Sequence, residues 1–136
     1  MMAEQREVVS CFLECAGRLL LLKRSQEVGS YRGQWATVSG YVESLPPDEQ
    51  ALVELSEEVS LSEADLRLVK KGEPLKVFDR KMGLRWVIHP YLFSVENEDK
   101  VCLDWEHDDS VWIDPAELDA YDTVPKLRES LARVWD

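Results

Sequence analysis

The sequence predicts a single α+β domain over residues 1–136, and three observations favour this fold class. The length is typical of one domain, and 45% hydrophobic residues supply enough apolar surface for a packed core. Several apolar runs bounded by turn residues are typical of β-strands. Residues 48–59 instead carry apolar side chains at helical spacing. Strands and at least one amphipathic helix are therefore expected in one unit.

The chain is expected to begin with a β-hairpin. Residues 8–15 and the leucine-rich run 19–24 are predicted strands, and Ala-Gly-Arg at 16–18 has the composition of a turn. Residues 28–38 and 40–47 contain glycines or a Pro-Pro pair, so both are predicted to be loops. The hairpin thus precedes a long irregular connection to the first helix.

The helix over 48–59 is the clearest element in the sequence. Pro47 is suited to a first helical turn, where its missing N–H leaves no bond unmade. The apolar stripe that faces the core consists of Ala51, Leu52, Leu55 and Val59.

Two further strands are predicted at 66–78 and 84–95, linked by a turn at 81–83. The second contains Pro90, which lacks the N–H that a central strand uses, so an edge strand or a bulge is expected there. An apolar edge of this kind would be suited to pairing in a homodimer.

The last part of the chain is predicted to form a polar turn, a short strand and two helices. The turn spans 96–100 and the strand 111–113, while Asp114 and Pro115 have the pattern of a helix cap and first turn. A C-terminal helix is predicted over 124–135 from its apolar spacing.

The charge distribution limits the classes of partner. The formal net charge is −11, which disfavours long nucleic acids and anionic membranes because their phosphates would be repelled. Residues 41–66 hold eight acidic and no basic groups, and residues 96–122 hold eleven acidic groups and one basic group. The segment 67–95 between them is basic. This composition is compatible with a soluble protein or with cation binding.

A cytoplasmic location is expected. The N-terminus lacks the pattern of a signal peptide, and no apolar run reaches the length of a membrane span. Cys11, Cys15 and Cys102 are an odd number without metal-site spacing, so neither a disulfide framework nor a zinc site is expected.

Three carboxylates in the helix 48–59 form the most informative pattern. Glu54, Glu57 and Glu58 are spaced three and four residues apart, which places them on one face. Like charges at this spacing destabilise a helix, whereas a shared Mg²⁺ would reverse the effect because it prefers carboxylate oxygens. On spacing alone, a solvated acidic face remains the other interpretation.

The stretch Gly40–Leu61, GYVESLPPDEQALVELSEEVSL, resembles the Nudix box. Glu54-Leu55-Ser56-Glu57-Glu58 matches its E-U-x-E-E core, where U is aliphatic, and Leu61 matches its closing aliphatic position. The LLLLKR strand, Gly33-x-Trp35 and the late Trp112 are similar to the family's flanking sequence. The resemblance implies the Nudix fold, a mixed β-sheet sandwiched between α-helices.

The match to the Nudix box is incomplete. Val53 occupies the position of the motif arginine and Ser60 that of the late glycine. The loop glutamate is absent, Leu45-Pro46-Pro47 stands there instead, and the first half is one residue short. Because the glutamate and the arginine are lost together, no buried charge would be left unpaired.

The resemblance implies hydrolysis of a pyrophosphate bond with Mg²⁺ or Mn²⁺. By motif position, the implied metal ligands are Glu54, Glu57, Glu58 and the backbone carbonyl of Gly40. Glu57 and Glu54 would also serve catalysis, and Glu106 in the second acidic segment is a candidate general base. His107 has a suitable pKa for proton transfer, but a single histidine there is interpreted as an incidental surface residue.

The phosphates of a substrate require basic side chains as partners, and a nucleobase requires an aromatic side chain on which to stack. Candidate substrate-binding residues are Arg24, Arg32, Tyr31 and Arg85. The predicted function is a Mg-dependent hydrolase of a small nucleotide or nucleoside-diphosphate-linked substrate. Two alternatives remain: a catalytically weakened Nudix-fold domain that binds a nucleotide or phosphorylated metabolite as a regulatory module, and an interaction module whose acidic faces bind a basic partner.

Overall fold

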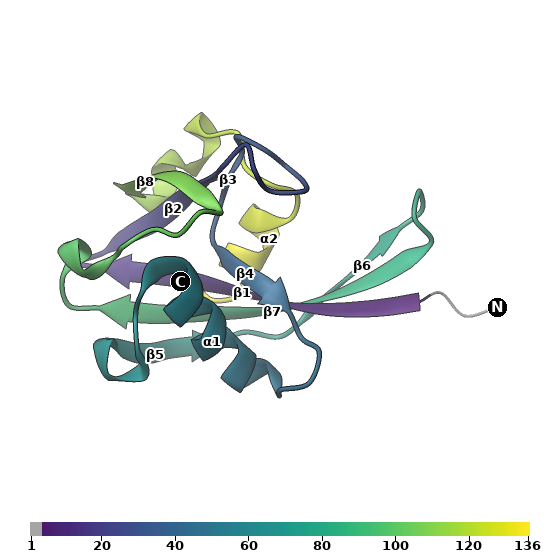
Figure 1. Ribbon diagram of the computed structural model, residues 1–136, viewed down its shortest axis with the longest axis horizontal. Coiled ribbons are helices and arrows are strands. Elements are labelled where there is room, and N and C mark those ends of the chain that lie inside the picture. The colour runs from purple at the N-terminus through teal and green to yellow at the C-terminus, as the bar shows by residue number, and fades with distance from the viewer. Residues whose placement is uncertain (1–3) are drawn as a thin grey trace.

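A mixed β-sheet forms the centre of the computed structural model, which describes residues 4–136 (Figure 1). Its strands follow the order β3-β2-β1-β7-β5, with β4 on β1, β6 on β7 and β8 on β2. Within these residues, no helix combines the length and the apolar composition needed to cross a membrane. The elements are β1 (Glu4–Cys15), β2 (Arg18–Arg24), β3 (Trp35–Ala36), β4 (Val38–Tyr41), α1 (Pro47–Val59), η1 (Glu63–Asp65), β5 (Leu66–Lys71), β6 (Leu75–Asp79), β7 (Leu84–Val95), η2 (Glu98–Lys100), β8 (His107–Ile113), η3 (Pro115–Ala120) and α2 (Leu127–Ala132).

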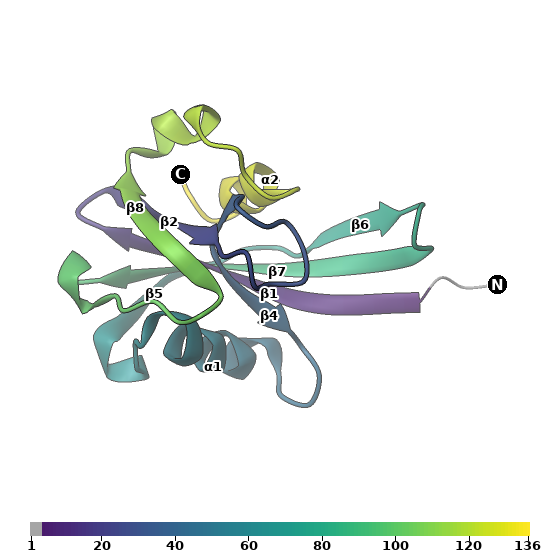
Figure 2. The same ribbon diagram turned by 45° about the horizontal axis from the view of Figure 1, so that its top comes forward.

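The sheet lies between two helical layers, as the sequence predicted. α1 covers one face, and α2 with η3 covers the other (Figures 1 and 2). The four leucines of β2 explain the sandwich, because Leu20 and Leu22 pack with α1 whereas Leu19 and Leu21 pack with α2. A strand buried on both faces needs a continuous apolar run, which β2 has.

The predicted strand over 84–95 is present as β7, but it is not an edge strand. It pairs in parallel with β1 on one side and antiparallel with β5 and β6 on the other. Pro90 is accommodated because the partner strand is interrupted between Lys71 and Leu75, and the Gly72 N–H donates to the Pro90 carbonyl at 3.0 Å. The homodimer therefore stays a prediction without support from an exposed β7 edge.

Three strands extend beyond the helical layers as an arm. Figures 1 and 2 show that β6, the first half of β7 and the first half of β1 project away from α1 and α2. The pairing of β6 with Leu84–Ile88, and of Glu4–Val8 with the same residues, makes this arm three strands wide. The site described below lies on the main body, beside α1.

Other predicted boundaries were corrected by tertiary pairing. The regions 28–38 and 40–47, predicted as loops, contain β3 and β4, which are too short to show an alternating pattern. The strand predicted over 66–78 is divided into β5 and β6. The C-terminal helix is shorter than 124–135, because Lys126 adopts a left-handed conformation just before α2.

Candidate active site

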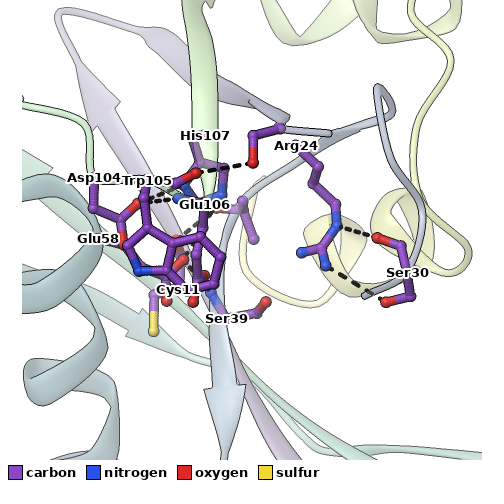
Figure 3. A network of polar contacts seen from close by, with 11 residues as sticks. Cys11, Arg24, Ser30, Ser39, Glu58, Asp104, Trp105, Glu106 and His107 are labelled. Atoms are coloured by element: carbon purple, nitrogen blue, oxygen red, sulfur yellow. Dashed lines mark hydrogen bonds and ion pairs between the residues drawn. The ribbon is translucent and has the colours of Figure 1, made fainter. Parts of the chain in front are cut away.

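The helix α1 directs Glu54 and Glu58 toward β4. Glu58 is buried at 2% exposure, Glu54 is half-buried and Glu57 is exposed at the rim. Figure 3 shows Glu58 close to Ser39 of β4 and to His107 of β8. The sequence-predicted set is thus brought to one end of the helix, with one member buried.

Glu58 has few partners for a buried acid. The Ser39 N–H donates to Glu58 Oε1 over a long 3.5 Å, and Oε2 has no hydrogen-bond partner among the described residues. Burial, followed by the negative charges of Glu106 and Glu54, raises the pKa of Glu58 to about 10. Without a cation, the folded protein therefore carries Glu58 in its protonated form at neutral pH.

Glu54 lies against the backbone of Gly40. A side-chain carbon at Gly40 would overlap the Glu54 carboxyl group, so only glycine leaves room for this carboxylate. The Gln50 Nε2 donates to Glu54 Oε2 at 2.8 Å and orients it. Burial raises the pKa of Glu54, and Glu57 and Asp104 add to the rise. The position of Gly40 in the motif thus has a steric reason in this structure.

The loop before β8 brings Glu106 to the same place. Buried Ser25 fixes this loop, because its hydroxyl donates to the Trp105 carbonyl and its N–H donates to the Glu106 carbonyl, both at 2.8 Å. The pKa of half-buried Glu106 is raised by burial and then by the charges of Asp104 and Glu54. Glu106, predicted as a candidate base, accordingly lies within the electrostatic reach of the helix carboxylates.

His107 is not the surface residue that the sequence suggested. It is only 4% exposed, with Nδ1 at 3.3 Å from Asp104 Oδ1 and Nε2 at 3.8 Å from Glu58 Oε1. Burial lowers its pKa, so the neutral imidazole is favoured. The prediction failed because burial of His107 depends on a strand irregularity that no local pattern reveals.

Of the four predicted substrate-binding residues, the structure places Arg24 beside this cluster. The Arg24 Nε donates to the Ser30 carbonyl at 2.9 Å, and its charge acts on the pKa of Glu106. Arg32 and Tyr31 are exposed on the same 25–34 loop. Arg85 instead lies on the projecting arm, opposite Phe78 of β6, and the structure does not bring it to the carboxylates.

Sequence reasoning also missed Trp105. Its side chain is 62% exposed although its backbone is anchored by Ser25, and Figure 3 shows it beside Glu106 at the front of the cluster. Most large aromatic side chains are buried, so a rigidly placed, exposed tryptophan next to a carboxylate cluster is a candidate ligand contact. No sequence signal separates Trp105 from a core residue.

The donor set is chemically suited to a hard divalent cation. Glu54 and Glu58 offer carboxylate oxygens, Gly40 offers a backbone carbonyl, and the buried Glu58 Oε2 lacks a partner. Over residues 4–136, no three His, Cys, Asp or Glu side chains are already arranged as a complete ligand set. The suitability of this site for a divalent cation therefore rests on the chemistry of its donor atoms and on the unpartnered Glu58 oxygen.

Comparisons with known proteins agree with this fold. The family model described as the NUDIX domain matches residues 4–134. A nucleoside triphosphatase, NudI, from Salmonella typhimurium is 29% identical over 134 residues, covering 94% of this chain and 95% of the relative. A solved MutT protein from Methanosarcina mazei Go1 has a TM-score of 0.76 at 19% identity, covering 98% of this chain and 95% of that chain. A MutT NUDIX hydrolase from Burkholderia pseudomallei has a TM-score of 0.71 at 26% identity, covering 96% and 98%.

The buried acid predicts an unusual pH dependence of stability. The Glu58 pKa rises from 4.5 to about 10 on folding, so its contribution is complete below pH 4.5 and is lost as pH rises toward 10. In chelator, Glu58→Gln should make the protein more stable than wild type at pH 8.5, by at least about 1.4 kcal/mol, the value of one pH unit of pKa difference. Thermal unfolding from pH 5 to 9 measures this.

The exposed neighbour provides the control for that experiment. Glu57→Gln removes the same charge at the rim of the cluster and should change the pH profile much less. A Glu58→Gln variant that is less stable than wild type at every pH would contradict the protonated state of Glu58.

Proposed function

The chain belongs to the Nudix family of pyrophosphohydrolases, and we propose that its substrate is a small nucleotide or nucleoside-diphosphate-linked compound, cleaved with the help of Mg²⁺ or Mn²⁺. The observation that carries this proposal is the convergence of Glu54 and Glu58 beside Gly40, with one buried carboxylate oxygen unpartnered. The name of the Salmonella relative, a nucleoside triphosphatase, makes nucleoside triphosphates the first compounds to test.

The carboxylates divide into a buried and a rim group. Glu58, Glu54 and the Gly40 carbonyl would hold the cation from the protein side, and exposed Glu57 would complete its ligands from the solvent side. A bound Mg²⁺ or Mn²⁺ supplies neutralisation of phosphate charge and a more acidic water. Glu106 is the candidate base, since its burial and acidic neighbours raise its pKa and so its affinity for a proton.

Substrate binding is assigned to the side of the cluster where the 25–34 loop lies. Arg24 and Arg32 would face phosphates, and Tyr31 or Trp105 would stack on a base. Arg85 remains a prediction that depends on a substrate long enough to reach the arm. The net charge of −11 supports a small ligand carried with a cation rather than a long nucleic acid.

The proposed location is the cytoplasm. Cys11, Cys15 and Cys102 are all free thiols, which is usual in a reducing compartment. Cys102 is exposed, so its thiol would be open to oxidation in an oxidising compartment.

The first activity prediction concerns Glu57. Glu57→Gln should lower the metal-dependent hydrolysis of nucleoside triphosphates and dinucleotides by at least about 100-fold, because it removes a ligand or catalytic charge at the reacting end. Phosphate or nucleotide release in Mg²⁺ or Mn²⁺ is the measurement. Glu73→Gln is the control, since Glu73 is exposed between β5 and β6 and should leave the rate unchanged.

Two outcomes decide between hydrolysis and binding. Equal rates for wild type and Glu57→Gln would exclude a catalytic role of this site. Thermal stabilisation by nucleotide and metal without any turnover would favour the regulatory binding module.

Gly40→Ala gives a second prediction: it should weaken metal binding strongly and change stability little. Gly40→Ala should displace the Glu54 carboxylate, a flexible side-chain end, and so change stability by less than about 1 kcal/mol. Mn²⁺ affinity and hydrolysis should both fall by about tenfold or more. Calorimetry and thermal unfolding measure the two effects.

The chain offers a matched glycine for this test. Gly29→Ala adds the same methyl group where no atom lies within 4 Å, and its Mn²⁺ affinity should equal that of wild type. Unchanged Mn²⁺ affinity in Gly40→Ala would remove Glu54 from the proposed ligand set.

Trp105 gives a third prediction, which tests the nucleotide part of the proposal. Trp105→Ala should raise KM for nucleoside triphosphates, since stacking on a base contributes about 1–3 kcal/mol. Hydrolysis of inorganic tripolyphosphate, which has no base, should be unaffected. Phe78→Ala on β6 is the control for loss of an exposed aromatic ring. Equal effects of Trp105→Ala on both substrates would show that Trp105 does not contact a base.

A further inference from the structure

A bulge in β8 determines where His107 points. From Leu19↔Ile113 to Lys23↔Asp109, β2 and β8 pair in regular register, and then Arg24 pairs with His107, so Asp108 is the extra residue. In such a bulge two residues of one strand lie opposite one residue of its partner. Residues of β8 on the N-terminal side of the bulge therefore point to the opposite face of the sheet from the one that regular alternation would give them.

The bulge places His107 on the face of the sheet that α1 covers. Along β8, Trp112 packs with the core on the α1 side, whereas Val111 and Ile113 pack with the core on the α2 side. Strict alternation would put His107 with Val111 and Ile113. The extra residue Asp108 reverses this, and Figure 3 shows the imidazole beside Glu58.

The imidazole lies between two acids. Its Nδ1 is 3.3 Å from Asp104 Oδ1, and its Nε2 is 3.8 Å from Glu58 Oε1. Asp104 is itself fixed to the end of α1, because its N–H donates to the Glu58 carbonyl at 3.2 Å. The contact with Asp104 thereby orients the ring, so that Nε2 faces Glu58.

This arrangement leaves polar atoms unsatisfied. Glu58 Oε2 and His107 Nε2 are the buried side-chain polar atoms that lack a hydrogen-bond partner across residues 4–136. Buried polar atoms without partners destabilise a fold, and an apolar pair of similar volume would avoid that cost. The two atoms belong to side chains in contact, so the cost falls at this one place.

His107 has no route to a substrate. The exposed fraction of its side chain is 1%; Nδ1 faces Asp104 and Nε2 faces Glu58. A direct contact with phosphate or with the attacking water is therefore excluded. Any action of His107 on the reaction would pass through the acids that it contacts, Glu58 and Asp104.

We propose that His107 is a positioning residue, oriented by Asp104, that packs against Glu58 and holds its carboxyl group in place for a divalent cation; this inference rests on the proposed function. Partners behind metal-binding side chains fix their orientation, and loss of such a partner weakens metal binding by about 10–100-fold. The bulge at Asp108 is the structural device that brings the imidazole to this position, consistent with bulges that redirect side chains beside active sites.

Two isosteric variants test which ring nitrogen matters. His107→Gln keeps an amide near the place of Nε2, facing Glu58, whereas His107→Asn keeps one near the place of Nδ1, facing Asp104. Mn²⁺ affinity is measured by calorimetry without substrate, and thermal unfolding is measured in chelator. His107→Asn should weaken Mn²⁺ binding by about tenfold or more, and His107→Gln should stay within about threefold of wild type.

A role in folding alone predicts a different result. If both variants retain wild-type affinity, or if both lose affinity in proportion to their loss of stability in chelator, the proposal is wrong. Should His107→Asn fail to fold, Asp104→Asn provides the second route: it keeps an acceptor near Nδ1 but removes the charge that orients the ring. A loss of Mn²⁺ affinity in Asp104→Asn supports the proposal, and wild-type affinity overturns it.

The second histidine of the chain is a matched control. His89 Nε2 contacts Glu7 Oε1 at 2.8 Å, so His89→Asn breaks a histidine–carboxylate pair that does not include Glu58 and should leave Mn²⁺ affinity unchanged. Failure of wild type to bind Mn²⁺ would overturn the positioning role together with the metal part of the proposed function. If wild type binds Mn²⁺ and the His107 variants bind it equally well, the positioning role alone is overturned and the proposed function stands.

Discussion

The buried carboxyl group of Glu58 is the constraint around which this end of the molecule is arranged. A buried carboxylate is costly unless it is paired, and here it meets one long backbone N–H, an imidazole and two other acids. The metal-free fold meets this constraint by keeping the proton on Glu58. A cation would replace that proton, so cation binding, proton release and stability are linked at one side chain.

The departures from the Nudix box affect the support of the site rather than its carboxylates. Ser60, where the motif has glycine, adopts the left-handed conformation at φ 62° that glycine adopts without strain. Its hydroxyl donates to the Cys102 carbonyl at 3.3 Å, and the Cys102 N–H donates to the Val59 carbonyl at 3.0 Å. The loop before β8 thus caps the end of α1, which offsets the strain at Ser60 and keeps Asp104 beside Glu58.

Local patterns in the sequence predicted the parts of the fold that depend on local spacing. The helix α1, its three glutamates and the β1–β2 hairpin follow from periodicity and turn chemistry. The roles of Pro90 and His107 could not be predicted, because each depends on how a distant strand pairs: β5 and β6 are interrupted beside Pro90, and β8 bulges against β2 before His107. The position of the Trp105 backbone likewise depends on a bond made by Ser25, eighty residues away.

The two acidic segments of the chain come together in the fold. The acidic segment 41–66 contributes Glu54, Glu57 and Glu58, and the acidic segment 96–122 contributes Asp104 and Glu106 to the same place. The basic segment between them forms β5, β6 and β7, on the other side of β1 from β2 and β8. Negative potential is therefore concentrated at the proposed binding site for an anionic substrate. A bound cation would make the negative site and an anionic substrate compatible. Because its attraction acts over a few ångströms, it would favour a short phosphate chain over a long polyanion.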